Sequence, residues 1–292
     1  MGNFQRGTIS FMYKKPSHIK NVLAKCGIYA LALLWLVITI YPLVFLIQNS
    51  FKQSMEFFTT TVWSLPQKFS LVNYQRIWES HFYRFFFNSA IVTSVSLMII
   101  LLVGSAAAFG LSRIRFRYRN LFYFLFVGGL TIPVHITLIP VYTLTRSLGL
   151  YDSLWALIGP YVASNLPVTA FILVAFMEEI PLSLEEAGYI DGATRWQIYW
   201  HIVLPISRPA MTAVGIFNSV VLWNEFIFAL VLISSEAKRP LTLGLWNFQG
   251  QFSADIPAMM AALFLSMLPL LIFYAILRER LIEGLTAGAI KG

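Results

Sequence analysis

The sequence predicts an all-α membrane protein with six transmembrane helices, and its composition and charge spacing carry this prediction. Of the 292 residues, 58% are hydrophobic and 12% are charged, whereas an ordinary soluble domain has roughly 45–50% apolar and about 25% charged residues. Six long apolar stretches separate the charged residues. Because about 20 apolar residues in a helix cross a bilayer, each stretch is long enough for one span.

The six predicted spans follow one another along the chain, and polar segments connect them. They cover residues 26–51, 85–112, 120–145, 153–177, 209–235 and 256–277, with Glu225 interrupting the fifth. Backbone amides in lipid must be hydrogen-bonded within their own segment, which leaves helices or closed barrels. These runs are too long and continuous for barrel strands. The first run is also too long for a signal peptide and no cleavage site follows it, so we interpret it as a retained span.

The placement of Lys and Arg predicts the orientation, because cytoplasmic loops keep the positive charge. With the amino terminus inside, 14 of the 21 Lys and Arg residues lie on the cytoplasmic side, four of them in the short loop 112–120. Both termini are therefore expected in the cytoplasm. This topology accounts for the net charge of +8 and argues against nucleic-acid binding. The single cysteine, Cys26, excludes an intramolecular disulfide and Cys-rich metal sites.

The expected domain organisation follows from these limits. Residues 1–25 form a basic cytoplasmic arm, and residues 26–292 form one six-helix domain with an extracytoplasmic loop at 52–84 and a cytoplasmic loop at 178–208. Proline and glycine are dense in the third and fourth spans and predict bends there. These bends are either simple kinks or hinges of a moving bundle. The residues concerned are Gly128, Gly129, Pro133, Pro140, Gly159, Pro160 and Pro167.

Segment 178–208 holds seven charged residues and cannot cross the bilayer. Pro181 ends the preceding span, and Ser183 with Glu186 predicts a capping box that starts a short helix reaching about Ile190. The pair Asp191-Gly192 predicts a turn, since glycine accepts the left-handed conformation that closes a helix. A second helix is expected from about Thr194.

The second helix of this segment is expected to be amphipathic. Its apolar face consists of Trp196, Tyr199, Trp200 and Val203, and Leu204-Pro205 ends it. One side of the first helix is small enough for another backbone to come close, and it consists of Leu184, Ala187 and Gly188. The hairpin either lies on the membrane surface or meets a protein. Its acidic residues favour the protein, because the inner leaflet is negative.

The hairpin resembles the cytoplasmic EAA loop of ATP-binding-cassette (ABC) importer permeases. That family shows E-A-A-x-x-D-G-A and, about ten residues later, I-x-L-P. Here these positions are Glu186, Ala187, Gly188, Asp191, Gly192, Ala193, Ile202, Leu204 and Pro205. Gly188 replaces the usual second alanine, at a cost of about 1 kcal/mol in helix stability. The stretches "YPLVFLIQNSFK", "AAFGLSRIRFRYRN", "WNEFIFALVL" and "GLTAGAIKG", in this order, resemble the maltose-type carbohydrate-uptake branch.

The resemblance implies a type I ABC importer permease fold and a transport subunit, not an enzyme, in the cytoplasmic membrane. The implied partners are a homologous permease, two ABC ATPase subunits, an extracytoplasmic solute-binding protein and a carbohydrate, an oligosaccharide in particular. ATP and Mg²⁺ would bind to the ATPase subunits, and no cofactor is expected in this chain, which lacks G-x-x-x-x-G-K-[ST]. The expected ATPase-coupling residues are Glu185, Glu186, Ala187, Gly188, Asp191, Gly192, Ala193, Leu204 and Pro205.

A path for a carbohydrate needs hydrogen-bonding groups at membrane depth. In the fifth span Asn218 and Glu225 are seven residues apart and share a helical face, with Asn224 at its edge. An ionisable residue at this depth is a functional candidate. Weaker candidates are Asn165 and Ser164 in the fourth span and His135 in the third. The alternative for each is a hydrogen bond that holds the bundle together or, for His135, simple packing.

Other transport mechanisms and chemistries are less well supported. A secondary transporter usually shows several buried charged groups and repeated halves, whereas this chain has one acid within its spans. No filter motif indicates a channel, and no H-E-x-x-H or G-x-S-x-G motif indicates a membrane enzyme. An ion-gradient-driven transporter of a polar solute remains the alternative function. The sequence does not identify the sugar.

Overall fold

The computed structural model describes residues 18–251 and 255–289, and all regular structure in these ranges is helical. Most of the expected arm 1–25 and the end of the stretch "GLTAGAIKG" therefore lie outside the described residues. The longest helices are α1 (His18–Ser50), α4 (Phe82–Arg113), α7 (Trp155–Glu178) and α14 (Ile256–Ala289). The others are α2 (Ser54–Thr59), α3 (Val72–Glu79), α5 (Arg119–Gly129), α6 (Val134–Ser147), α8 (Leu182–Ile190), α9 (Arg195–Ile198), η1 (Tyr199–Val203), α10 (Leu204–Ile206), α11 (Arg208–Trp223), α12 (Ile227–Leu232), η2 (Glu236–Lys238) and α13 (Leu241–Gln251).

Within the described ranges, four helices are long and apolar enough to cross a membrane: α1, α4, α7 and α14. Helices α5 and α6 make a fifth candidate if they count as one broken span, because they are bent by 102°. The predicted span 209–235 consists of α11, which has 16 residues, and the short α12. Four or five spans are therefore observed as apolar helices, where six continuous spans are expected.

Only one of the expected proline bends is a break. Pro133 is the N-cap of α6, and its extended backbone separates α6 from α5. Pro140 lies inside α6, and Pro160 and Pro167 lie inside α7. Neighbouring helices allow a spanning helix to continue past a proline by satisfying the freed carbonyl groups.

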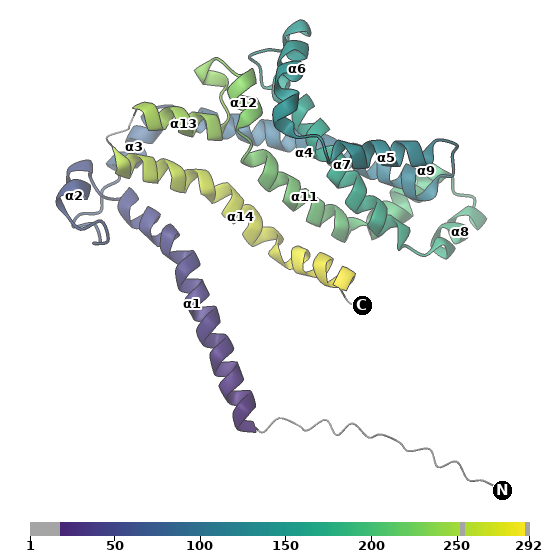
Figure 1. Ribbon diagram of the computed structural model, residues 1–292, viewed down its shortest axis with the longest axis horizontal. Coiled ribbons are helices and arrows are strands. Elements are labelled where there is room, and N and C mark those ends of the chain that lie inside the picture. Colours follow the sequence, from purple (N-terminus) through teal and green to yellow (C-terminus); the bar gives the residue numbers. More distant parts are fainter. Residues whose placement is uncertain (1–17, 252–254, 290–292) are drawn as a thin grey trace.

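The bundle is built around α4 and α7, which pack together along their length, while α11 packs against α4 and α14 packs against α11. Gly104 of α4 permits the close approach, because a Cβ there would lie 2.7 Å from Cγ2 of Thr169 on α7. Helix α1 diverges from this bundle along most of its length (Figure 1), and its large apolar side chains between Ile28 and Tyr41 are exposed. In a membrane this surface faces lipid or another helix.

Short helices cover the end of the bundle where α4 begins. Helices α2, α3 and α13 gather there, and α8 and α9 lie at the opposite end (Figure 1). Lys52 is fully buried and donates from Nζ to the carbonyl oxygens of Thr61 and Val62, both at 3.3 Å. Asn73 of α3 donates to the carbonyl oxygens of Ser50 and Lys52 at 2.8 Å. Loop 52–84 is thereby an ordered cap on the end of α1.

Candidate functional site

The charged segment 178–208 forms a helical hairpin at one end of the bundle (Figure 1). Its first helix, α8, starts at Leu182 with Pro181 as the N-cap, and no side chain caps it. The predicted capping box of Ser183 and Glu186 is therefore wrong. The proline conformation places the helix start one residue before Ser183, so that Ser183 lies inside the first turn.

A capping box is present instead at the start of the second helix. Thr194 is the N-cap of α9, and its backbone amide donates to Oε1 of Gln197 at 2.8 Å. The amide of Gln197 donates to the Thr194 hydroxyl at 3.4 Å. The second helix is thus fixed at its expected start, by a motif that sequence reading assigned to the first helix.

The turn between the two helices is formed by Gly192, as predicted. Gly192 has φ +82°, the left-handed conformation that glycine adopts without a steric penalty. The amide of Ala193 then donates to the carbonyl oxygen of Gly188 at 2.9 Å and closes α8. Gly188 is buried, and a Cβ there would lie 2.8 Å from Cδ1 of Ile202 on the second helix. The absence of a side chain at Gly188 therefore lets the two helices pack closely.

The second helix does not end at Leu204-Pro205, contrary to the prediction. It continues through a π-helical turn, η1, into α10 and ends at Ile206. In the π turn the amide of Leu204 donates to Tyr199, five residues back, and this wider turn accommodates Pro205. The expected apolar face is also divided, since Tyr199 and Val203 are buried whereas the larger Trp196 and Trp200 rings are exposed.

Tyr199 anchors the second helix to α4. Its hydroxyl lies 2.8 Å from the hydroxyl of Ser105 in a buried contact, and its ring lies 5.2 Å from that of Phe109. No local sequence pattern predicts this pair, because Ser105 and Tyr199 are distant in the chain. The hairpin is consequently part of the core and not a free loop.

Glu185 anchors the first helix, although sequence analysis grouped it with residues facing a partner. Its Oε1 lies 2.8 Å from Nε of Arg113, the last residue of α4, and both side chains are buried. Burial raises the pKa of the Glu185 carboxyl, and the charge of Arg113 partly offsets this shift. The Glu185 carboxylate is thus paired with an arginine of the same chain.

The remaining surface of the hairpin is exposed and combines acids with apolar side chains. Glu186, Ala187 and Asp191 are exposed, and Ile190 is 86% exposed at the tip. Trp196, 61% exposed, extends this surface on the second helix. An apolar patch with acidic neighbours outside the expected spans is typical of a contact surface for another protein. Ala193, Leu204 and Pro205 are half-buried behind it.

Asn218 and Asn165, two of the expected path residues, are buried and make hydrogen bonds within the bundle. Nδ2 of Asn218 donates to the hydroxyl of Thr169 on α7 and to the carbonyl oxygen of Val214, both at 2.9 Å. Asn165 donates to the carbonyl oxygen of Tyr161. The bond from Asn218 to Thr169 matches the alternative in which an asparagine side chain holds helices together, whereas the bonds of Asn165 stay within α7. Ser164, Asn224 and His135 are exposed.

Glu225 occupies the break between α11 and α12, so it does not continue the helical face of Asn218. Its Oε1 accepts from the amide of Phe228 at 2.7 Å, and its Oε2 accepts from the Tyr161 hydroxyl at 2.7 Å. The Glu225 backbone oxygen accepts from the Thr242 hydroxyl at 2.6 Å. The carboxylate therefore caps α12 and ties it to α7. Sequence reading missed both hydroxyl partners.

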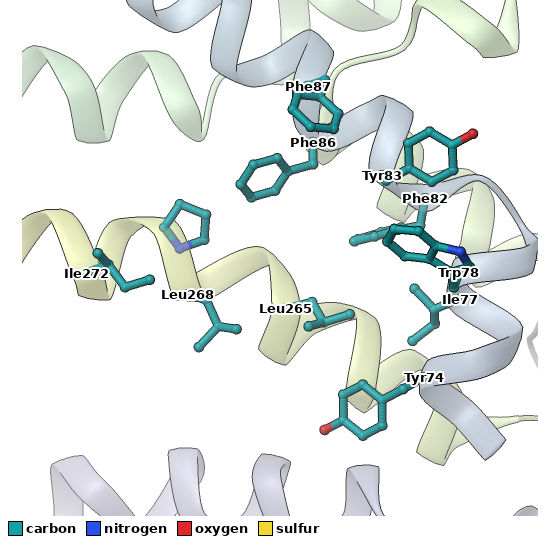
Figure 2. Close-up of a pocket in the computed structure, with 11 residues that line it drawn as sticks. Tyr74, Ile77, Trp78, Phe82, Tyr83, Phe86, Phe87, Leu265, Leu268 and Ile272 are labelled. Atoms are coloured by element: carbon teal, nitrogen blue, oxygen red, sulfur yellow. The ribbon is translucent and has the colours of Figure 1, made fainter. Parts of the chain in front are cut away.

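None of these residues lines a further, apolar cavity. It has a volume of about 480 Å³ and lies between α14 and the region around the start of α4. Figure 2 shows Phe86, Trp78 and Leu265 among the side chains around it. This apolar lining is suited to lipid or protein more than to a carbohydrate. A second cavity of about 220 Å³ beside the α5–α6 break is lined by Ser164, Thr137 and Phe228, among others.

Among the described residues, no group of His, Cys, Asp or Glu side chains is arranged to hold a metal ion. The site therefore consists of an anchored hairpin at one end of the bundle and polar side chains between its helices. Its geometry fits mechanical transmission, and none of these groups forms a recognisable catalytic arrangement.

The chain is similar to known transport proteins over most of its length. The family model described as "Binding-protein-dependent transport system inner membrane component" matches residues 100–286. A putative ABC transporter permease of a Caldicellulosiruptor species is 47% identical over 88% of this chain and 94% of its own length. A trehalose/maltose transport system permease of Thermococcus litoralis is 33% identical over 94% of this chain and 98% of its own length.

A solved structure has a similar fold. One chain of a bacterial ABC transporter involved in the import of the acidic polysaccharide alginate superposes with a TM-score of 0.75. The alignment covers 90% of this chain and 98% of that chain, at 22% sequence identity. At this identity the likeness concerns the helical fold alone.

Proposed function

This chain belongs to the family of binding-protein-dependent transport system inner membrane components, and we propose that it is the permease subunit of an ATP-driven importer of a carbohydrate. The anchored, exposed hairpin is the observation that carries this proposal. It combines a rigid attachment to α4, through Tyr199 and Glu185, with a surface suited to another protein. A transport subunit without a nucleotide-binding motif needs such a contact to receive work from an ATPase.

The carbohydrate is proposed from the relatives. The trehalose/maltose permease aligns with this chain over 98% of its own length, so nearly the whole of a sugar permease has a counterpart in this sequence. Longer saccharides are included in the proposal, because the stretches that resemble the carbohydrate-uptake branch do not distinguish a disaccharide from an oligosaccharide. Ser164, Asn165, Asn218, Asn224, Glu225 and His135 are the proposed path residues, of which Ser164 lines a cavity.

The proposed topology has six passes through the cytoplasmic membrane. Helices α1, α4, α7 and α14 each make one pass, the bent pair α5–α6 makes another, and α11 with α12 makes the sixth. Both termini and the hairpin then lie in the cytoplasm, in agreement with the placement of Lys and Arg. The cap at 52–84 lies outside.

The proposed complex contains this chain, a homologous permease, two ABC ATPase subunits and an external solute-binding protein. ATP and Mg²⁺ bind to the ATPase subunits in this arrangement. The residues proposed to contact or shape the ATPase interface are Glu186, Ala187, Gly188, Asp191, Gly192, Ala193, Leu204 and Pro205. Glu185 is proposed to contribute through its buried ion pair with Arg113.

Reconstituted transport tests the proposal. The chain is co-expressed with its partner subunits, purified as a complex and placed in proteoliposomes together with the solute-binding protein. We expect uptake of a bound saccharide with ATP and no uptake with an imposed proton or sodium gradient alone. Uptake by the isolated chain in response to a gradient would identify a secondary transporter instead.

A further inference from the structure

A buried ion pair joins the hairpin to the end of a spanning helix. Arg113 is the last residue of α4, and Glu185 lies in the first turn of α8. Their side chains are only 6% and 7% exposed, and Nε of Arg113 lies 2.8 Å from Oε1 of Glu185. Neither of these two atoms has a partner with hydrogen-bond geometry. The contact is therefore held by charge attraction in a buried setting, where screening is weak.

Arg113 also holds the link between α7 and α8. Its Nη2 donates to the carbonyl oxygen of Ile180 at 2.6 Å, and Ile180 lies between the last residue of α7 and the first of α8. One guanidinium thus contacts α8 and the end of α7 from the end of α4. Arg119 adds a more exposed contact nearby, with Nη2 2.8 Å from Glu178.

A second anchor lies about two turns earlier on α4. There the hydroxyl of Ser105 contacts Tyr199 of the second hairpin helix. The two hairpin helices are in turn packed together where Gly188 meets Ile202. Each helix of the hairpin therefore has its own attachment to α4, and the hairpin cannot rotate about a single contact.

An apolar contact of similar size would stabilise this junction at least as well, because burying an ion pair costs much of the attraction it provides. The ion pair instead restricts how the helices can be placed relative to one another. Charge attraction and the Ile180 hydrogen bond fix one relative position of α4, α7 and α8, whereas apolar surfaces can slide past each other. A junction that transmits displacement requires this property.

We propose that Arg113 is a positioning residue whose ion pair with Glu185 transmits displacement of the hairpin to α4 and α7. The inference rests on the proposed function, in which an ATPase moves the hairpin. When the pair is broken, the ATPase still docks on the exposed tip, but its movement is no longer passed fully to the spanning helices. The loss appears as ATP hydrolysed without solute transported.

Charge exchange across the pair tests this proposal in the complete complex. The variants are Arg113→Glu, Glu185→Arg and the double exchange, in proteoliposomes with the ATPase and solute-binding subunits. Each single variant is expected to lower the solute transported per ATP hydrolysed by about tenfold while ATP hydrolysis persists. The double exchange is expected to restore part of the ratio, because it restores the charge attraction but not the hydrogen bond to Ile180. Arg115→Glu, which changes an exposed arginine of the same loop, is the matched control and leaves the ratio unchanged.

The ratio separates transmission from folding, because loss of folded complex lowers transport and hydrolysis together. An unchanged ratio in the assembled single variants would overturn the proposal, as would a double exchange that assembles and fails to recover. If single variants do not assemble, the double variant Arg113→Leu/Glu185→Leu replaces them, since it leaves no unpaired charge. A low ratio in that complex supports the proposal, and a normal ratio contradicts it. Absence of ATP-driven uptake in the unaltered complex would refute the proposed function itself.

Discussion

Glu225 makes structural hydrogen bonds and is also a proposed residue of the solute path. Its carboxylate caps α12 and accepts a hydrogen bond from Tyr161 of α7. Glu225→Leu removes both contacts, so we expect the free energy of unfolding to fall by about 1–2 kcal/mol, as for loss of a helix cap. Thermal unfolding of the purified complex measures this loss. Asn224→Ala, at the exposed neighbouring position, is the control.

Uptake by the same variant distinguishes the two roles of Glu225. If the carboxylate lines the solute path, Glu225→Leu changes the dependence of uptake on saccharide concentration in a complex that still assembles. Loss of assembly with unchanged kinetics in the surviving complex would assign Glu225 to the structural role alone.

Asp152 predicts a pH dependence of stability. It precedes α7 in a left-handed conformation with φ 57°. Its carboxylate accepts from the Ser235 hydroxyl, from the amides of Ser235 and Ser234 at 2.8 and 2.9 Å, and from Lys238 at 3.1 Å. The bonds from Ser235, above all, hold the pKa of Asp152 well below its usual range. This clamp joins the start of α7 to the segment after α12.

A lowered pKa means that folding stabilises the ionised form of Asp152. The contribution of Asp152 to the free energy of unfolding is therefore complete above the ordinary Asp pKa of about 3.9. It is lost as the pH falls through the folded-state pKa. We expect Asp152→Asn to lower the thermal midpoint at neutral pH and the difference from the unaltered protein to shrink below about pH 4. A difference that stays constant down to pH 3 would contradict the clamp. Asp191→Asn, at an exposed tip position, should show little difference at either pH.

At the residue scale, the glycine turn was predictable, whereas the capping box was assigned to the wrong helix and long-range partners were missed. Gly192 was correctly assigned because a left-handed turn residue is a local requirement. Glu185 was misassigned because its partner Arg113 belongs to another helix, distant in the chain. Pairings of this kind depend on packing, which no short sequence pattern records.

At the scale of elements, composition predicted where apolar helices lie but not how they bend. The resemblance to ABC importer permeases and the helical fold are confirmed by the family match and the similar solved structure. A bend near Pro133 was expected, but its angle of 102° between α5 and α6 was not, since a hydrophobic run of sufficient length does not specify its own tilt or angle. The π turn before Pro205 was not predicted either, because the same residues are compatible with an ordinary helix end.

The hairpin turn gives a prediction for a whole element. Gly192→Ala is expected to cost about 1 kcal/mol, since φ +82° disfavours a side chain while no atom lies near enough to clash. Gly192→Pro cannot adopt this conformation, because proline fixes φ near −65°. It should disrupt the hairpin and uncouple ATP hydrolysis from uptake, as measured in proteoliposomes. Gly128→Ala, at an uncrowded helical site, is the control, and normal transport by Gly192→Pro would contradict the transmission role.

At the scale of the whole molecule, the described chain has two distinct ends and one exposed helix. One end carries the ordered cap and the other the hairpin (Figure 1). Most of the apolar side chains of helix α1 are exposed. The sequence predicted this helix as a span but not its separation from the bundle. The charge pattern of the loops orients the two ends, with the hairpin expected inside. The proposed function requires that this hairpin lie in the cytoplasm and dock on an ATPase.

Accessibility of the hairpin tip tests this claim most directly. The protein has a single cysteine, so Cys26→Ser provides a cysteine-free background, and Ile190→Cys places a thiol at the 86% exposed tip. We predict that a membrane-impermeant maleimide labels this thiol in inside-out vesicles stripped of the ATPase and leaves it unlabelled in intact cells. Once the ATPase subunits are added back to the vesicles, the thiol should react slowly. Labelling from outside intact cells, or equal labelling with and without the ATPase, would contradict the account.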